Sequence, residues 1–348
     1  PPQPAGSRRL QRRRVSEAAE IEAALAADCG AMFDDPLGWV MWAYPWATDP
    51  ALQVVKLPAK YRARFDCEFG PDEWACELLD EIGALVRAHG FDGLKAVDPI
   101  KMAVASGHGI GKSALVAWLV GWIMATRPHS NGVITANTSD QLSTKTWAEV
   151  QKWNRRSLVG HWFEITTGRG AMKMTHRSSP ESWKTVAQTC REENSEAFAG
   201  LHAASSTPFY IFDEASAVPD SIWEVGEGGM TDGEPMWFAF GNPTRNVGKF
   251  AECFGGQRHR WVTRQIDSRR VQLTNKSTIQ GWVDDFGEDS DFVRVRVRGM
   301  FPRAGYANFI SPELVNQARR RRLAQLGAQR LDVRVHRAVG AVGIVAPH

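Results

Sequence analysis

The chain has 348 residues, 43% of them hydrophobic and 23% charged, which is the composition of a globular protein that can bury a core. Its five cysteines form no C-x-x-C pair, and its longest apolar run, residues 114–125, is too short to span a bilayer. These features argue against a disulfide-stapled protein, a cysteine zinc site and a membrane partner, so we expect a cytoplasmic protein. The net charge of +3 does not by itself indicate a nucleic-acid partner.

The first ninety residues are predicted to be helical after a short tail. Residues 1–15 are rich in proline and arginine, and we expect a disordered basic tail there. Helical patterns follow over residues 16–27 and over residues 71–90, where Pro71 stands near the helix start. We therefore predict a helical lead-in, or lid, over residues 16–90.

Short apolar runs then alternate with helical patterns. Strands are predicted over residues 102–105, 132–136, 183–187, 209–212, 236–240 and 260–266, and helices over residues 112–125 and 140–153. Such alternation is typical of an α/β fold in which crossover helices connect parallel strands. We therefore expect three layers, with a mainly parallel central sheet between helices.

A glycine-rich stretch between the first strand and the next helix is the first candidate for chemistry. "SGHGIGKS" matches the P-loop pattern G-x-x-x-x-G-K-[ST], except that serine takes the first position. Lys112 would reach the β- and γ-phosphates, the Ser113 hydroxyl would bind Mg²⁺, and loop N–H groups would face phosphate oxygens. The predicted nucleotide contacts are Ser106, Gly107, His108, Gly109, Ile110, Gly111, Lys112, Ser113 and Ala114. The alternative is a glycine-rich turn with an exposed lysine.

Two carboxylates follow a later apolar run, in "FYIFDEAS". A buried strand that ends in this pair would deliver Asp213 to Mg²⁺ and Glu214 to the attacking water, and the adjacent glutamate favours ATP over GTP. Alone, Asp213 would be read as a helix cap. Beside the P-loop, we expect Lys112 and the Asp213–Glu214 pair to converge on one triphosphate from adjacent parallel strands.

Polar residues also end the strand in "MWFAFGNPT". Asn242 and Thr244, at the tip of a strand beside the nucleotide, could sense the γ-phosphate through hydrogen bonds and respond to its hydrolysis. A purely local Gly-Asn-Pro turn is the alternative.

Arginines alternate with apolar residues in "FVRVRVRGMFPR". On a strand this pattern would place several guanidiniums on one face, which suits sequence-independent contacts to DNA phosphates. A charged, solvated sheet edge is an equal alternative. The candidates are Arg258, Arg260, Arg264, Arg294, Arg296, Arg298 and Arg303.

These motifs, in this order, resemble the ATPase part of a tailed-phage terminase large subunit, the motor that moves viral DNA into a procapsid. The likeness spans residues 74–312 and is carried by "SGHGIGKS", "TANTSDQLSTKTWAEV", "CREENSEAFAGLHA", "FDEASAVP", "GNPTRNVGKF" and "RQIDSR". It implies a P-loop ATPase domain of the RecA-like class over residues 91–312, with a small linker subdomain over about residues 245–312.

The resemblance also implies roles for single residues. Lys112 and Ser113 would be the Walker A contacts, Asp213 and Glu214 the Walker B pair, and residues 241–244, with Asn242 and Thr244, the motif that couples hydrolysis to movement. The catalytic set is then Glu214, Lys112, Asn242 and Thr244, the metal set is Ser113 and Asp213, and the cofactors are ATP and Mg²⁺.

Two departures from the family pattern stand out. His108 occupies a position where many terminases carry an arginine, so the charge must come from elsewhere, with Arg191 or a neighbouring subunit as candidates. Ala75, after Trp74, replaces the glutamine of an adenine-binding motif.

The resemblance implies double-stranded DNA, a portal protein and a small terminase subunit as partners, a homo-oligomeric ring and the host cytoplasm as location. Residues 313–348 are predicted to be a helix and an irregular tail, in which Asp332 alone cannot form a two-metal nuclease site. We therefore expect an ATPase without endonuclease activity. Another P-loop DNA translocase or helicase, or an inactive prophage remnant that only binds ATP, remains an alternative.

Overall fold

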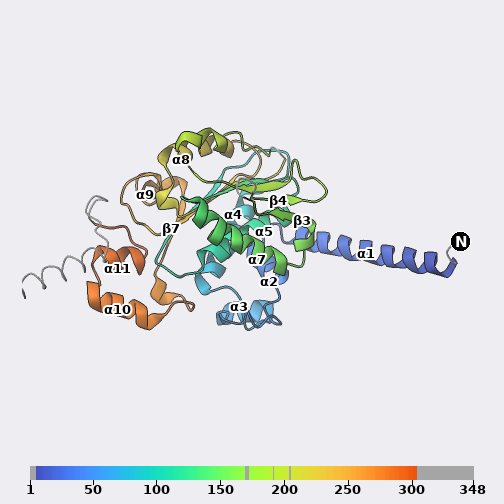
Figure 1. The fold of residues 1–348 in the computed structure, drawn as a ribbon, viewed down its shortest axis with the longest axis horizontal. Coiled ribbons are helices and arrows are strands. Elements are labelled where there is room, and N and C mark those ends of the chain that lie inside the picture. The colour runs from blue at the N-terminus through green and yellow to red at the C-terminus, as the bar shows by residue number, and fades with distance from the viewer. Residues whose placement is uncertain (1–4, 169–171, 191, 204, 304–348) are drawn as a thin grey trace, which may run out of the picture. The chain divides into compact units, whose positions relative to one another are not determined.

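A single eight-stranded sheet, with strand order β3-β4-β5-β2-β6-β7-β1-β8, forms the centre of the computed structural model (Figure 1). The structure describes residues 5–168, 172–190, 192–203 and 205–303. The strands are β1 (Ile100–Ser106), β2 (Asn131–Thr135), β3 (Phe163–Thr166), β4 (Lys173–His176), β5 (Lys184–Ala187), β6 (Pro208–Asp213), β7 (Met236–Gly241) and β8 (Val262–Ile266).

Most of the sheet is parallel. Strands β5, β2, β6, β7, β1 and β8 pair in parallel, whereas β4 pairs antiparallel with both β3 and β5. Asp213 at the end of β6 lies opposite Phe240 of β7, which lies opposite Val104 of β1. The carboxyl ends of these three strands therefore meet at one edge of the sheet, where ligands bind in open α/β folds.

The helices that surround the sheet have unequal lengths. They are α1 (Ala5–Ala31), α2 (Pro36–Ala43), α3 (Ala59–Phe65), α4 (Glu73–His89), α5 (Lys112–Thr126), α6 (Ser139–Gln141), α7 (Trp147–Arg156), α8 (Asp220–Glu227), α9 (Lys249–Phe254), α10 (Lys276–Phe286) and α11 (Asp291–Arg296). A π-helical turn, Leu142–Thr146, connects α6 with α7.

Two hydrophobic cores lie on the two faces of the sheet, because alternate strand residues point to opposite sides. Val104 and Ile211 belong to the core that includes residues of α2, α4, α5 and α7. Ala103 and Phe212 belong to the core that includes residues of α8 and α9. Helix α5 is apolar on nearly all sides and is buried within the first core, next to α7 (Figure 1). These layers confirm the predicted three-layer α/β fold.

Three expectations about local structure were wrong. Residues 5–15 form the first part of α1 and are not a disordered tail, because arginine, glutamine and leucine favour helix once the prolines up to Pro4 have passed. The stretch "FVRVRV", expected as a strand, lies mostly in α11, and Val293 and Val295 of this helix are buried together with Val297 directly after it. Strands β3 and β4 were not predicted, since both are short and carry polar residues.

A fourth expectation concerned the order of the strands. Strand β7 lies between β1 and β6, so the P-loop strand and the carboxylate strand are not adjacent. Asn242, which follows β7, therefore lies between the end of β1 and the end of β6.

Helices α10 and α11 pack together (Figure 1). A small third cluster of apolar side chains around them includes Ile279, Val293 and Val297. It falls within the linker subdomain predicted over residues 245–312, although residues 304–348, with the predicted tail, lie outside the described residues. The domain boundaries stay predictions. No helix in the described part of the chain combines the length and apolar character needed to cross a membrane.

Candidate functional site

The glycine-rich loop connects β1 directly to α5. Ser106 ends the strand and is fully buried, and Lys112 is the first residue of the helix. Gly109 and Gly111 have φ angles of 75° and 87°, a conformation that side chains with a Cβ rarely adopt. The loop therefore has the backbone that a phosphate-binding turn before a helix N-terminus requires.

The Lys112 side chain folds back over this loop. Its Nζ donates a hydrogen bond of 3.0 Å to the Ser106 Oγ and lies 3.5 Å from the carbonyl oxygen of Gly107. Burial lowers the pKa of Lys112, while the charges of Asp213 and Glu214 oppose that shift. The carboxylates of Asp213 and Glu214 thus act on the charge of the Lys112 ammonium. Their convergence on one bound triphosphate stays a prediction.

The tip of β6 holds its two carboxylates differently. Asp213 is 5% exposed, and its Oδ2 accepts a hydrogen bond of 2.6 Å from the Thr146 hydroxyl of the π-helical turn. Its Oδ1 accepts the main-chain N–H of Glu214 at 3.0 Å. Glu214 has a positive φ of 54°, so the chain turns sharply directly after the strand.

Glu214 is a carboxylate whose proton affinity is raised. Burial, followed by the negative charge of Asp213, raises its pKa, while Lys145, Lys112 and a hydrogen bond with Gln141 lower it. A carboxylate of this kind accepts a proton more readily than an exposed one.

Asn242 connects the tip of β7 to the glycine-rich loop. Its Nδ2 donates a hydrogen bond of 2.6 Å to the carbonyl oxygen of Ser106. The main-chain carbonyl oxygen of Asn242 accepts hydrogen bonds from the Ser216 hydroxyl and, at 2.8 Å, from the N–H of Thr244. The turn at residues 241–244 is therefore tied both to the P-loop and to the segment that follows Glu214.

A cavity of about 450 Å³ lies beside the helix end of the loop. Trp74 donates its indole N–H to the carbonyl of Ile110 at 3.2 Å and lines this cavity. The other lining residues are Trp46, Ala51, Leu52, Val54, Val55, Gly70, Pro71, Asp72, Ala75, Gly109, Ile110, Gly111, Lys112, Ser113, Ala114, Trp118, Glu149, Lys152, Trp153 and Leu273. The volume and the mainly apolar lining are those of a ligand pocket, and the cavity adjoins the glycine-rich loop.

His108 contacts Arg296 through both its main chain and its imidazole ring. Its main-chain N–H donates a hydrogen bond of 2.8 Å to the carbonyl of Arg296, and its Nε2 lies 2.7 Å from the Nη1 of the same arginine. Burial, and then the charges of Arg296, Lys112 and Lys145, lower the pKa of His108 to about 4. Its imidazole is therefore neutral at pH 7. Arg191, the arginine considered for this charge, lies outside the described residues.

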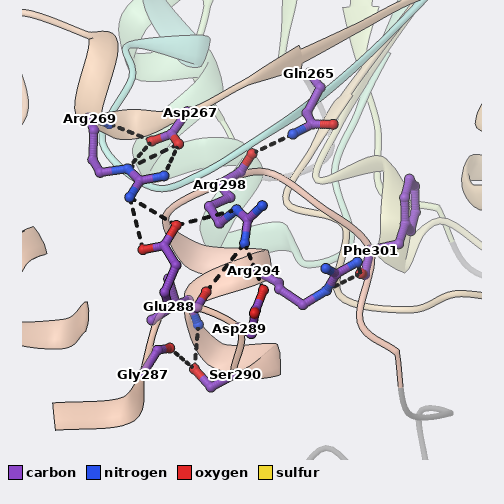
Figure 2. Close-up of polar contacts among 11 residues, drawn as sticks. Gln265, Asp267, Arg269, Gly287, Glu288, Asp289, Ser290, Arg294, Arg298 and Phe301 are labelled. Carbon is purple, nitrogen blue, oxygen red and sulfur yellow. Dashed lines mark hydrogen bonds and ion pairs between the residues drawn. The ribbon is translucent and has the colours of Figure 1, made fainter. Parts of the chain in front are cut away.

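Most of the arginines proposed for DNA contacts are engaged within the protein. Arg298 pairs with Glu288 and Asp289, and Arg294 donates to the carbonyl of Phe301 (Figure 2). Arg260 and Arg264 form ion pairs with Glu227 and Glu81 at 2.8 and 2.6 Å. The structure does not place the seven arginines on one strand face, since α11 is a helix and Arg258 and Arg260 lie in a 3-10 turn.

The structure brings to the site four residues that the sequence did not place there. Thr146, Lys145 and Gln141 approach the β6 carboxylates, and Arg296, expected as a DNA contact, approaches the loop. The first three follow the end of β2, a neighbour of β6, so their position after a parallel strand was a usable signal. Arg296 is 188 residues from His108, and no local pattern indicates that contact.

Comparison with known proteins finds the family that the sequence motifs resemble. No protein-family model matches the chain. It is 25% identical over 245 residues to a protein of Enterobacteria phage P7 described as a probable terminase, large subunit, covering 64% of this chain and 46% of that protein. The chain thus spans about half the length of the curated relative it matches.

Solved structures of similar fold include phage terminases. The HK97 bacteriophage large terminase aligns over 77% of this chain and 55% of its own, with a TM-score of 0.51 and 11% identity. A large terminase ATPase domain from a Thermus phage aligns over 58% of this chain and 88% of its own, with a TM-score of 0.43 and 18% identity. The sequence match to the P7 protein, together with the fold shared with the HK97 protein, identifies this chain as a relative of phage terminase large subunits.

Proposed function

We propose that this chain hydrolyses ATP as the motor of viral DNA packaging and couples hydrolysis to the movement of double-stranded DNA into a procapsid. The observation that supports the proposal is the register of the strands: the glycine-rich loop with Lys112 follows β1 and the carboxylates stand at the end of β6, and both strands pair in parallel with β7, so their carboxyl ends lie at one edge of the sheet. A lysine on a glycine-rich loop and two carboxylates at strand ends are the groups that phosphoryl transfer from ATP requires.

Each group has a distinct task in this proposal. The loop residues from Ser106 to Ala114 bind the phosphates through main-chain N–H groups, and Lys112 exchanges its bond with Ser106 for phosphate oxygens. Glu214, with its raised pKa, takes the proton of the attacking water. The nucleotide base binds in the cavity lined by Trp74, where it packs against apolar side chains. This packing substitutes for the contact of the family's glutamine, whose position Ala75 occupies.

The donor set fits magnesium. Mg²⁺ binds proteins through one or two oxygen ligands together with substrate phosphates and waters, so a hydroxyl and a carboxylate suffice. Ser113 at the start of α5 and the buried Asp213 supply these, and within the described ranges no cluster of three or more His, Cys, Asp or Glu offers a different metal site. When bound, the ion would neutralise charge that develops on the phosphates.

Asn242 and Thr244 would be the first residues to respond to hydrolysis. The Asn242 side chain donates to Ser106, the last residue of β1, and the main-chain oxygen of Asn242 accepts from Ser216, two residues after Glu214. A change in the phosphates therefore reaches the chain after residue 244 through two hydrogen bonds, which is a short path from chemistry to the linker subdomain.

The partners follow from the kind of protein that the P7 relative is described as. Large terminase subunits work with a portal protein, a small subunit and double-stranded DNA, and we propose the same partners, a homo-oligomeric ring and the host cytoplasm for this chain.

The test is ATP turnover by the purified chain, with and without double-stranded DNA. Glu214→Gln and Lys112→Ala should each reduce turnover at least about 100-fold, and DNA should raise the turnover of the native chain. Glu164→Gln is the matched control, because Glu164 is 63% exposed on the far edge strand β3 and should leave turnover unchanged.

The outcomes separate the alternatives. If Glu214→Gln and the native chain hydrolyse ATP at the same rate, the assignment of the site is wrong. Nucleotide binding without turnover would identify a remnant that only binds ATP. Turnover that depends on DNA but not on a portal-bearing procapsid would indicate another translocase or a helicase.

A further inference from the structure

The three arginines of "VRVRVR" have different surroundings. Arg298 pairs with Glu288 and Asp289, and Arg294 donates to the carbonyl of Phe301 (Figure 2). Arg294 also lies 4.0 Å from Asp291. Arg296 is half-buried, and among the described residues no carboxylate lies within 4 Å of it. Its Nε is buried and has no hydrogen-bond partner in the part of the chain that the structure describes. Arg296 is thus a half-buried cation with no carboxylate partner among the described residues.

The segment that carries Arg296 lies directly against the start of the P-loop. The Ser268 N–H donates to the carbonyl of Val297 at 2.8 Å, and the Ser268 hydroxyl donates to that of His108 at 2.7 Å. A Cβ on Gly107 would lie 2.3 Å from the Val297 carbonyl oxygen, so only glycine fits there. These main-chain contacts fix the position of Arg296 relative to the loop.

The contact with His108 gives Arg296 an uncharged partner. His108 is neutral at pH 7 and accepts from Arg296 through Nε2, which places its own proton on Nδ1. Lys112 lies on the same loop, where its Nζ donates a hydrogen bond of 3.0 Å to Ser106. Arg296, through its contact with His108, therefore adds a second cation to the loop, and a polyanion is the ligand that such a pair of cations binds.

We propose that Arg296 binds the γ-phosphate of the nucleotide, with His108 positioning its guanidinium. The inference rests on the proposed function and adds a substrate-binding residue to it. A guanidinium can keep one N–H on His108 and direct others to phosphate oxygens, because its donors form a planar fork. Helix α11 would in this way supply to the P-loop the positive charge that a histidine at position 108 cannot.

The test compares nucleotides with and without a γ-phosphate. Arg296→Gln should weaken binding of a non-hydrolysable ATP analogue about 10- to 100-fold, the effect of one hydrogen bond to a charged group, and should leave ADP binding nearly unchanged. Arg298→Gln is the matched control, since that arginine belongs to the same segment but binds Glu288 and Asp289, and it should change neither affinity. Arg296→Lys, which keeps the charge, should lose less than Arg296→Gln.

A rescue variant distinguishes charge from structure. In the Arg296→Gln background, His108→Arg returns a guanidinium to the loop and should restore most of the lost affinity for the ATP analogue. Equal weakening for the analogue and for ADP, or tighter binding of the analogue, would overturn the proposal. If the native chain and Lys112→Ala bind the analogue equally, the proposed function itself fails, whereas a Lys112-dependent site that ignores Arg296 refutes this inference alone.

Discussion

The Asn242 side chain donates a hydrogen bond of 2.6 Å to the main-chain oxygen of Ser106, across 136 residues of sequence. The bond joins the tip of β7 to the last residue of β1, and β7 lies between β1 and the carboxylate strand β6. The Ser216 hydroxyl, two residues after Glu214, donates to the main-chain oxygen of Asn242, so hydrogen bonds connect the end of β7 both with β1 and with the segment after β6.

Asn242→Asp should separate nucleotide binding from turnover. The replacement keeps the shape but places a carboxylate against the Ser106 carbonyl, so an attraction becomes a repulsion. We expect ATP turnover to fall about tenfold or more, while affinity for the nucleotide changes less. Steady-state kinetics and equilibrium titration measure the two quantities.

Asn154→Asp is the control for this change. The Asn154 Nδ2 also donates to a main-chain oxygen, that of Gly160 at 3.2 Å, but at the end of α7 away from the strand tips. Unchanged turnover in Asn242→Asp, or an equal loss in Asn154→Asp, would remove the basis for coupling through β7.

Thr146→Val tests how Asp213 is held. The Thr146 hydroxyl is buried and donates at 2.6 Å to Asp213, so its loss leaves a buried carboxylate oxygen without a donor. We expect the free energy of unfolding to fall by about 1.5 to 3 kcal/mol, the range for hydrogen bonds to charged groups. Denaturant titration measures it, and the Mg²⁺ concentration that gives half-maximal turnover should also change.

Thr185→Val is the matched control, since the Thr185 hydroxyl is fully buried in β5 and has no partner among the described residues. Valine there should be neutral or stabilising. A loss as large at position 185 as at position 146 would mean that shape, not the bond to Asp213, sets the cost.

The raised pKa of Glu214 predicts how ATP turnover and stability depend on pH. Its pKa lies above the ordinary value of 4.5, so the acid limb of the turnover profile should lie above pH 4.5. A carboxyl whose folded-state pKa is raised contributes most to stability below its ordinary pKa, and the contribution is lost as pH rises through the raised value. Glu214→Gln should therefore unfold at a higher temperature than the native chain at pH 7, with a smaller difference at pH 4. Thermal unfolding at both pH values checks the sign.

The parts of the site that sequence predicts are those encoded locally. The β1 strand, the glycine turn and the apolar helix follow one another in the chain, and the carboxylates stand directly after a buried run. The insertion of β7 between β1 and β6 depends on crossover connections, and the Arg296–His108 contact joins segments 188 residues apart. Neither leaves a periodic signal.

Helix α11 shows how a period can mislead. Alternating valine and arginine has the period of a strand, yet Val293 and Val297 are four residues apart and pack together with Ile279 of α10. The packing partner, not the alternation, determines the structure, and the same helix turns Arg296 towards the P-loop.

His108 provides a second pH test, with the opposite kind of shift. Its pKa is lowered from 6.5 to about 4, so the folded state resists its protonation while the unfolded state does not. The stability this provides is complete above pH 6.5 and is lost as pH falls towards 4. His108→Gln should flatten the dependence of the unfolding temperature on pH in that window. An unchanged slope would show that the imidazole titrates normally.

Breaking the buried ion pair of Arg127 and Glu234 should lower the free energy of unfolding without changing nucleotide binding. The Arg127 Nε lies 2.7 Å from Glu234 Oε2, and the two side chains are 1% and 0% exposed. Glu234→Gln leaves the guanidinium without its counter-charge among Phe33 and Trp122, whose rings it covers. Breaking a buried pair in this way costs about 3 to 5 kcal/mol, because the remaining charge is desolvated without compensation.

Chemical denaturation measures this loss, and Glu164→Gln again serves as the control. Glu164 and Arg177 are 3.8 Å apart and more than half exposed, so their separation should cost no more than about 1 kcal/mol. Arg127 follows the end of α5, at the opposite end of that helix from Lys112, and Glu234 precedes β7. Nucleotide affinity should therefore stay unchanged at temperatures where Glu234→Gln is folded, and a parallel loss of affinity would show that the pair also supports the P-loop through α5.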